Sequence, residues 1–140
     1  TRDRYAHKGV NLVVDADGAA GLRVTVDRRR IAQALANLLA NALRHTPPGG
    51  TVTISAVRTR GAAAITVADN GDGIPAGQLP RIFERFYRGD AARAHGQTGS
   101  GIGLTITKAI IDAHDGHITA ESRGPGEGAA FTMTLPRAIA

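Results

Sequence analysis

Residues Gln33–Thr46 of this 140-residue chain read QALANLLANALRHT and form the most regular pattern in the sequence. Apolar residues recur through it and just before it at helical spacing, within about 60° of one another on a helical wheel. These residues are Ile31, Leu35, Leu38 and Ala42. The spacing predicts a helix over Asp27–Thr46 with one apolar face, and the run Pro47-Pro48-Gly49-Gly50 ends it.

The same helix carries a second, polar face. Asn37, Asn41 and Arg44 also lie within about 60° of one another, roughly 120° from the apolar stripe. Asparagine is a poor helix-interior residue because its amide competes with the backbone for hydrogen bonds. An amide oxygen can ligate Mg²⁺, and an arginine can neutralise phosphate oxygens. The face is therefore either an ordinary solvated surface or a site for a metal and a phosphate.

The remainder of the chain predicts several strands and two more helices. Strands are expected at Leu12–Val14, Leu22–Val26, Thr51–Ala56, Ile65–Val67, Ile118–Ser122 and Ala130–Leu135, and helices at Gln78–Phe86 and Gly101–His114. The apolar side of the last helix is predicted to hold Ile102, Ile106, Ala109, Ile110 and Ala113. Gly116 is expected to end that helix in the left-handed conformation. We therefore expect one domain over residues 1–140, an α+β two-layer sandwich whose mixed sheet of about five strands is covered on one face by about three helices.

A glycine-rich segment, Asp69–Pro75 or DNGDGIP, directly follows a predicted strand. Its alternating glycines, Gly71 and Gly73, allow the backbone to turn sharply and to approach a ligand closely. Asp69 stands at the strand end, where its carboxylate can accept a hydrogen bond from an exocyclic amine. A calcium loop is disfavoured because the required glutamate is missing. A plain turn is the alternative.

A second such segment, Gly99–Leu104 or GSGIGL, runs into a predicted helix. Backbone N–H groups and the helix dipole favour a phosphate group at such a helix start. The segment is not a Walker A loop, because no Gly-Lys-Ser/Thr follows, and its G-x-G-x-G spacing is not the dinucleotide fingerprint. A glycine-rich helix start without a ligand is the alternative.

Between these two segments lies IFERFYR, residues Ile82–Arg88, followed by the small, polar stretch Gly89–Thr98. We expect a mobile loop, hinged by glycines, that carries Arg85 and Arg88. The phenylalanines in it predict that part of the loop folds back on the core. A surface helix with a loose connection is the alternative.

Composition excludes several classes of function. The absence of cysteine excludes a disulfide scaffold, a thiolate zinc site and a cysteine nucleophile. The net charge of +5 is compatible with a nucleic-acid ligand. Because only 4% of the residues are aromatic and could stack on bases, we expect no nucleic-acid binding. The phosphate tail of a nucleotide fits the charge as well. No apolar run approaches the ~18–20 residues of a membrane span. Because the chain starts TRDRYAHKG, without Met or a secretory signal, we expect a piece of a longer protein.

Four of these segments resemble, in order and spacing, the N, G1, F and G2 boxes of sensor histidine kinases. QALANLLANALRHT is similar to the N box, DNGDGIP to the G1 box, IFERFYR to the F box and GSGIGL to the G2 box. The resemblance covers residues 27–136, and residues 5–26 resemble the leading strands of the family. It implies the Bergerat ATP-binding fold, which gyrase, heat-shock chaperones and mismatch-repair ATPases share.

The resemblance implies roles residue by residue. Asn41 would hold Mg²⁺, Asn37 would support the triphosphate site, and Arg44 would contact phosphate where the family often has Lys. His45, in place of a frequent Tyr, would lie against the nucleotide, and Asp69 would bind the adenine amino group. The ATP lid would span residues 79–99. The other implied nucleotide-binding residues are Gly71, Gly73, Ile74, Arg85, Arg88, Gly99, Ser100, Gly101, Ile102, Gly103 and Leu104.

The chain departs from the family pattern in two places. Gly128 is followed by Ala129, where the family often has a Gly-Thr pair that helps to bind adenine. None of the 5 histidines lies in the phosphoacceptor motif of the family's helical dimerisation domain. We therefore expect the catalytic domain without its own substrate histidine.

The resemblance implies transfer of the γ-phosphoryl group of Mg-ATP to a histidine on a separate dimerisation domain, with a response regulator downstream. ATP-hydrolysing relatives have a glutamate where this chain has Asn37, and an amide is not a base at neutral pH. This favours transfer over hydrolysis. An ATPase or Ser/Thr kinase of the same fold, or a nucleotide-sensing module without catalysis, are the alternatives. The parent protein is expected to be a homodimer anchored in the cell membrane, with this domain in the cytoplasm.

Overall fold

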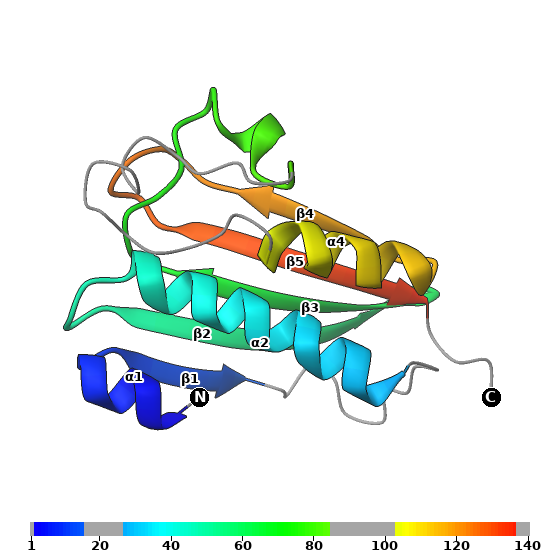
Figure 1. Cartoon of the computed structure of the whole chain (residues 1–140), viewed down its shortest axis with the longest axis horizontal. Coiled ribbons are helices and arrows are strands. Elements are labelled where there is room, and N and C mark those ends of the chain that lie inside the picture. The colour runs from blue at the N-terminus through cyan, green and yellow to red at the C-terminus, as the bar shows by residue number, and fades with distance from the viewer. Residues whose placement is uncertain (1, 16–26, 85–102, 137–140) are drawn as a thin grey trace.

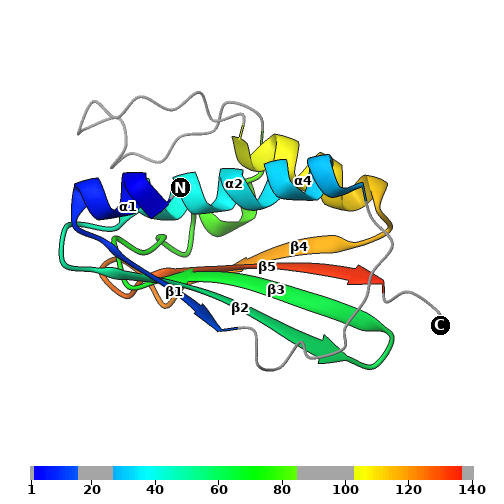
Figure 2. The ribbon, with the colours of Figure 1, turned by 90° about the horizontal axis from the view of Figure 1, so that it is seen from below.

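The computed structural model describes residues 2–15, 27–84 and 103–136 as a sheet with helices over one face (Figures 1 and 2). The helices are α1 (Arg2–Lys8), α2 (Arg28–His45) and α4 (Gly103–Ala113), with a 3₁₀ turn at Leu79–Arg81. The strands are β1 (Asn11–Asp15), β2 (Thr51–Thr59), β3 (Ala62–Asp69), β4 (His117–Glu121) and β5 (Ala129–Pro136). The described residues thus confirm the predicted α+β two-layer sandwich.

The five strands form one mixed sheet in the order β1-β2-β3-β5-β4. β1 runs parallel to β2, and the other neighbours are antiparallel. The register aligns Val67 with Phe131 and Ile65 with Met133, so alternate residues of both strands face the helices. Phe131, Met133 and Leu135 are all buried, as their alternation predicts. At the opposite end of this ladder Asp69 is aligned with Ala129.

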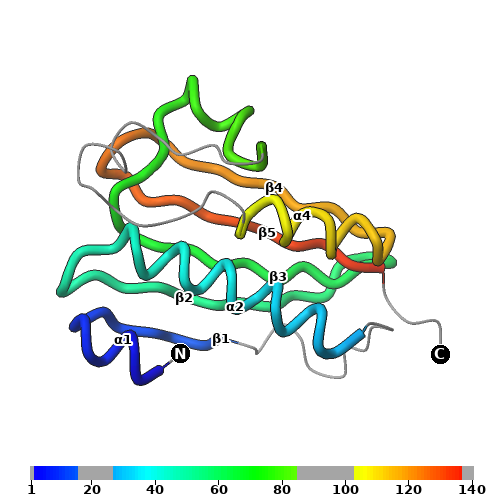
Figure 3. Tube along the Cα trace, viewed as in Figure 1, coloured from blue at the N-terminus to red at the C-terminus, as the bar shows by residue number. Residues whose placement is uncertain are grey.

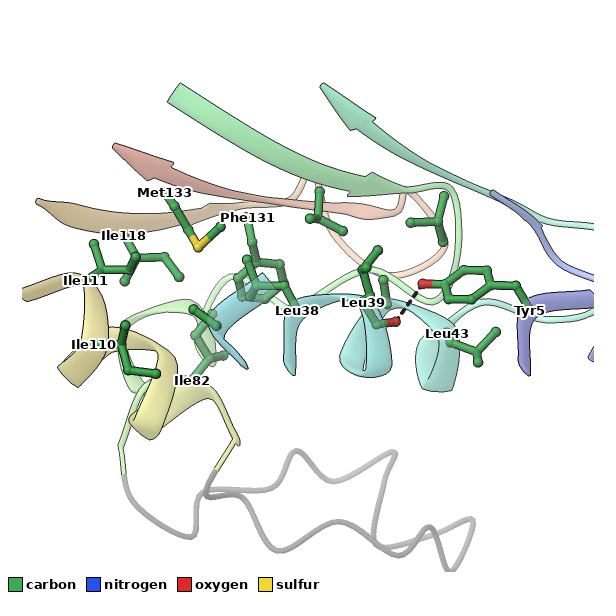
Figure 4. Packing of buried hydrophobic residues seen from close by; sticks show 14 of the residues in the cluster. Tyr5, Leu38, Leu39, Leu43, Ile82, Ile110, Ile111, Ile118, Phe131 and Met133 are labelled. Carbon is green, nitrogen blue, oxygen red and sulfur yellow. Dashed lines mark hydrogen bonds between the residues drawn. The ribbon is translucent and has the colours of Figure 1, made fainter. Parts of the chain in front are cut away.

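The long helix α2 has the caps that its sequence requires. The side chain of Asp27 accepts hydrogen bonds from the backbone N–H groups of Arg29 and Arg30, which otherwise lack a partner in the first turn. Leu38 and Ala42 of the predicted stripe are buried, but so are Ala34, Leu39 and Leu43. The buried surface is wider than predicted because α2 packs on the sheet and also beside α1 and α4 (Figures 2 and 4).

The helix α1 was not expected from the sequence. Its seven residues contain no helical repeat of apolar positions, and Tyr5 is its one buried residue. Tyr5 is 2% exposed, and its hydroxyl donates to the carbonyl oxygen of Leu39 in α2 at 2.6 Å (Figure 4). Lys8 Nζ donates to the Leu43 carbonyl oxygen at 2.6 Å. Tertiary contacts with α2 therefore hold this helix in place, as a helix so short is unstable alone.

Two local predictions were wrong. The helix expected at Gln78–Phe86 is, over its described part, a series of tight turns in which Gln78, Arg81 and Glu84 each donate to the carbonyl three residues earlier. Proline at position 80 stands in the first turn, where a missing N–H is tolerated, so it does not by itself prevent a longer helix. The left-handed residue after α4 is Asp115, with φ 60°, and not Gly116. Gly116 is needed for another reason, because a Cβ there would collide with the carbonyl oxygen of Thr134 in β5.

The apolar side of α4 was also predicted partly wrong. Ile110 is buried as expected, but Ala109 and Ala113 are exposed, and Thr107 and Ile111 are buried instead. The helix packs on both α2 and the sheet, so its buried side is centred between them. The strand expected at Leu22–Val26 lies outside the described residues. Among the described helices, none has the length and apolar character needed to cross a membrane.

The contact of Tyr5 predicts a pH-dependent stability. Burial, followed by the negative charge of Asp69, raises the pKa of Tyr5 from 10.0 to about 12. The neutral phenol is therefore favoured in the folded state, and its contribution is complete below pH 10 and lost as the pH rises towards 12. At neutral pH, Tyr5→Phe should lower the free energy of unfolding by about 1 kcal/mol through the lost hydrogen bond.

Urea unfolding of the wild type and of Tyr5→Phe in parallel, from pH 7 to pH 12, tests this. Between pH 10 and pH 12 the wild type should lose about 1 kcal/mol relative to the variant, less than the ~1.4 kcal/mol per pKa unit of an unscreened group. A difference between the two proteins that stays constant over this range would contradict the assignment.

Candidate active site

The end of α2 is locked against the loop Asp69–Pro75. The backbone N–H of Asp72 donates to the carbonyl oxygen of His45 at 2.9 Å. Gly71 passes so close below that carbonyl that a Cβ at this position would collide with it. Only glycine allows this approach. The last turn of the helix that carries Asn41 and Arg44 is therefore fixed relative to the loop that begins with Asp69.

The same loop is held from its other side by the connection between β4 and β5 (Figure 3). Gly126 N–H donates to the carbonyl oxygen of Asp72 at 2.7 Å, and Gly128 N–H donates to that of Gly71 at 3.2 Å. Gly73 has φ 74°, and a Cβ there would collide with the carbonyl oxygen of Gly124. The glycines of the loop thus serve close backbone packing on both sides.

Asp69 is a half-buried carboxylate at the end of β3. Its Oδ1 accepts a hydrogen bond from the N–H of Gly71 at 2.9 Å. Burial raises the pKa of Asp69 above its ordinary value, while the N–H groups of Gly71 and Ala129 oppose that shift by stabilising the charged form. The site thus holds a desolvated acceptor whose orientation is set by backbone donors. Such a group can accept a hydrogen bond from a ligand amine.

His45, the last residue of α2, lies beside this carboxylate. Burial lowers the pKa of His45, and the charge of Arg44 lowers it further, whereas Asp72 opposes the shift. Its Nδ1 is 3.6 Å from Oδ2 of Asp72, which is long for a hydrogen bond. The imidazole is therefore neutral at pH 7 and offers an uncharged ring surface beside Asp69.

The polar face of α2 is half-buried and not fully solvated. Asn37, Asn41 and Arg44 all have intermediate exposure. Asn37 Nδ2 donates at 3.3 Å to the carbonyl oxygen of Gly103, which also accepts from the hydroxyl of Thr107 at 2.9 Å. The start of α4 is thereby attached to the middle of α2. Asn41 and Arg44 follow on α2, between this contact and the loop that holds Asp69.

Besides Asn41 and Arg44 on α2, the predicted site residues fall into four groups. Asn37 is joined to Gly103, and His45 and Asp69 are joined to the loop of Gly71 and Gly73. Ile74 and Leu104 pack against the hydrophobic core. Arg85, Arg88, Gly99, Ser100, Gly101 and Ile102 lie outside the described residues.

Only the first part of the predicted lid, residues 79–84, is described, and it packs on the core. Ile82 is 8% exposed, and the ring of Phe83 meets Phe131 edge-on, with centroids 6.2 Å apart. The hydroxyl of Thr105 in α4 donates to the carbonyl oxygen of Phe83 at 2.9 Å. This bond joins the chain just before residues 85–102 to the chain just after them.

The sequence analysis named Gly128 but did not predict that residues 122–126 lie against the loop of Asp69. The described residues place Ser122, Gly124, Gly126 and Gly128 against the loop of Asp69. The alternation of three glycines was a usable signal, since it matches the spacing of Gly71 with Gly73.

No group of three His, Cys, Asp or Glu side chains able to hold a metal occurs within the described part of the chain.

Comparison with known proteins agrees with this architecture. Residues 26–139 match the family model of histidine kinase-, DNA gyrase B- and HSP90-like ATPases. The chain is 41% identical over 139 residues to the sensor-like histidine kinase SenX3 of Mycobacterium tuberculosis (strain ATCC 25618 / H37Rv), an alignment that covers 99% of this chain and 34% of SenX3.

Solved structures of histidine kinases have the same fold. The nucleotide-free catalytic domain of ThkA superposes with a TM-score of 0.82 at 29% identity, covering 99% of this chain and 87% of that one. ThkA in complex with the response regulator protein TrrA superposes with a TM-score of 0.78 at 28% identity, covering 98% of this chain and 37% of that one. Full-length ShkA in complex with AMPPNP superposes with a TM-score of 0.84 at 28% identity, covering 99% of this chain and 28% of that one.

The chain belongs to the family of histidine kinase-, DNA gyrase B- and HSP90-like ATPases. Within that family it is a catalytic ATP-binding domain of the sensor histidine kinase type. It spans about a third of the length of SenX3.

The packing of the loop predicts that the effect of an added methyl group on stability depends strongly on its position in the loop. Gly73→Ala should lower the free energy of unfolding by ~2 kcal/mol or more, because the residue is left-handed and the new methyl meets the Gly124 carbonyl. Gly77→Ala is the matched control, since a Cβ there has open space. Urea unfolding of both variants measures the difference. Equal stabilities of the two variants would show that the loop is not packed as described.

Proposed function

We propose that this domain binds Mg-ATP between the polar face of α2, the loop Asp69–Pro75 and the start of α4. It then transfers the γ-phosphoryl group to a histidine on a separate dimerisation domain of the parent protein. One observation carries the proposal. A half-buried carboxylate that accepts a hydrogen bond from the Gly71 N–H lies in a loop joined to the C-terminal end of α2, the helix whose polar face carries Asn37, Asn41 and Arg44.

Adenine recognition is assigned to Asp69 and its loop. The Asp69 carboxylate accepts a hydrogen bond from the exocyclic amine, and its raised pKa reflects the desolvation that makes this bond selective. Ile74 supplies an apolar wall, since it packs with the core beside the loop. His45 is neutral, so it contributes a ring surface and no charge. Gly71 and Gly73 act indirectly, by bringing the loop against its neighbours.

The triphosphate and its metal are assigned to α2 and the segment before α4. Asn41 offers an amide oxygen, a ligand type suited to Mg²⁺, and Arg44 supplies positive charge for phosphate oxygens. When bound, Mg²⁺ neutralises charge on the transferring phosphoryl group. Asn37 holds the carbonyl of Gly103 and so positions the glycine-rich start of α4. We assign phosphate binding also to residues 99–104 and to Arg85 and Arg88, of which only residues 103 and 104 are among the described residues.

Phosphoryl transfer is favoured over hydrolysis by the chemistry at Asn37. This amide cannot act as a base towards water, and its nitrogen already donates to Gly103. The nucleophile is then the histidine of the dimerisation domain. The solved complex of ThkA with TrrA supports a response regulator as the next acceptor. We place the domain in the cytoplasm, in a parent that is a homodimer anchored in the cell membrane.

The role of Asp69 predicts opposite effects on binding and stability. Asp69→Asn should weaken ATP binding at least ~10-fold, because a charge-assisted hydrogen bond is replaced. The free energy of unfolding without ATP should be unchanged or higher, because the buried charge is removed. Calorimetric titration and urea unfolding measure the two quantities. Asp72→Asn, on the same loop but exposed, is the control. Unchanged ATP affinity in Asp69→Asn would refute the pocket.

The transfer reaction can be tested with radiolabelled ATP. Label should appear on histidine only when the chain, Mg²⁺ and the dimerisation domain of its parent are all present. Asn41→Ala should slow this labelling at least ~10-fold through loss of the metal ligand. Asn11→Ala, exposed on β1, is the matched control. Release of free phosphate at the same rate with and without the acceptor domain would instead indicate an ATPase.

A further inference from the structure

The hydroxyl of Ser122 is the meeting point of three backbone segments. It accepts hydrogen bonds from the N–H groups of Ile74, at 3.0 Å, and Gly124, at 3.2 Å. It donates to the carbonyl oxygen of Gly128 at 2.6 Å. Ser122 directly follows β4, and its side chain is partly buried. One oxygen therefore fixes the distance between the loop of Asp69 and the first residues of β5.

This hydroxyl is located where regular strand pairing stops. The ladder between β4 and β5 ends at the pair Glu121–Ala130. Beyond it the chain must still bring Ala129 to Asp69, its partner at the end of the ladder between β3 and β5. Gly128 packs so closely on the carbonyl of Asp69 that a Cβ there would collide with it. The bond from Ser122 to Gly128 therefore helps to hold the residue before Ala129 in place, together with the bond from the Gly128 N–H to the Gly71 carbonyl oxygen.

We infer that Ser122 is a positioning residue for recognition of the purine base, acting through Ile74 and through Gly128 and Ala129, which lie against Asp69. The inference rests on the adenine pocket proposed above. Ser122 itself need not touch the nucleotide. It sets the separation between the apolar wall at Ile74 and the carboxylate that meets the exocyclic amine.

The chemistry of the side chain explains why a hydroxyl is required. Two N–H groups need an acceptor and one carbonyl needs a donor, and a hydroxyl provides both at a single atom. Alanine leaves all three groups without this partner. Threonine keeps the hydroxyl, and cysteine keeps the size but is a weak donor and acceptor.

The experiment compares the affinities for ATP and for inosine triphosphate, which lacks the exocyclic amine. Wild type, Ser122→Ala, Ser122→Thr and the control Ser55→Ala are titrated calorimetrically, at a temperature where circular dichroism shows each to be folded. Wild type should prefer ATP at least ~10-fold. Ser122→Ala should lose about 5-fold or more of that preference, because ATP binding weakens more than the binding of inosine triphosphate. Ser122→Thr and Ser55→Ala should retain the preference.

Two outcomes would overturn the inference, and they are distinguishable. If the wild type does not discriminate between the nucleotides, the adenine pocket is wrong and the role of Ser122 falls with it. If the wild type discriminates and Ser122→Ala keeps the preference, or loses affinity equally for both nucleotides, only the positioning role is wrong. Should Ser122→Ala not fold, Ser122→Cys provides the same comparison.

Discussion

The close backbone packing of the loop Asp69–Pro75 is the constraint on which the rest of the site depends. On one side Gly71 lies below the His45 carbonyl, and on the other Gly73 lies against the Gly124 carbonyl. Because these are contacts between backbone atoms, they leave no freedom for side chains to compensate a shift. The loop therefore connects the helix layer to the sheet layer at one fixed distance. The position of Asp69, the first residue of this loop, is therefore also fixed.

The electrostatics of the site follow from this packing. The same burial raises the pKa of Asp69 and lowers that of His45, since removal from water disfavours the charged form of either group. Backbone N–H groups keep the carboxylate competent as an acceptor, whereas Arg44 adds to the penalty on a charged imidazole. The carboxylates of Asp69 and Asp72 thus stand beside a neutral ring, and the positive charge of Arg44 lies one residue away on α2. This division suits a ligand with an amine at one end and phosphates at the other.

Sequence reasoning succeeded where the pattern is local and failed where contacts come from distant segments. The alternation of Phe131, Met133 and Leu135 predicted the buried face of β5, because strand period alone decides it. The helix α1 was missed because Tyr5 is held by Leu39, 34 residues away. The apolar side of α4 was misplaced because two partners, α2 and the sheet, share it. Gly116 was predicted to adopt the left-handed conformation, whereas it is required by its close contact with β5, a strand that is remote in sequence.

The fold class, the order of the four boxes and the residues proposed for the site could be predicted from the sequence. These depend on periodicity and on residue chemistry, which are local properties of the chain. The placement of the β4–β5 connection against the loop of Asp69, with Ser122 joined to Ile74 and Gly128, came from the three-dimensional structure. The three-dimensional structure also decided the directions in which the pKa values of Asp69 and His45 move. Both depend on burial and on hydrogen bonds between segments some 50 residues apart, and no local pattern encodes such distances.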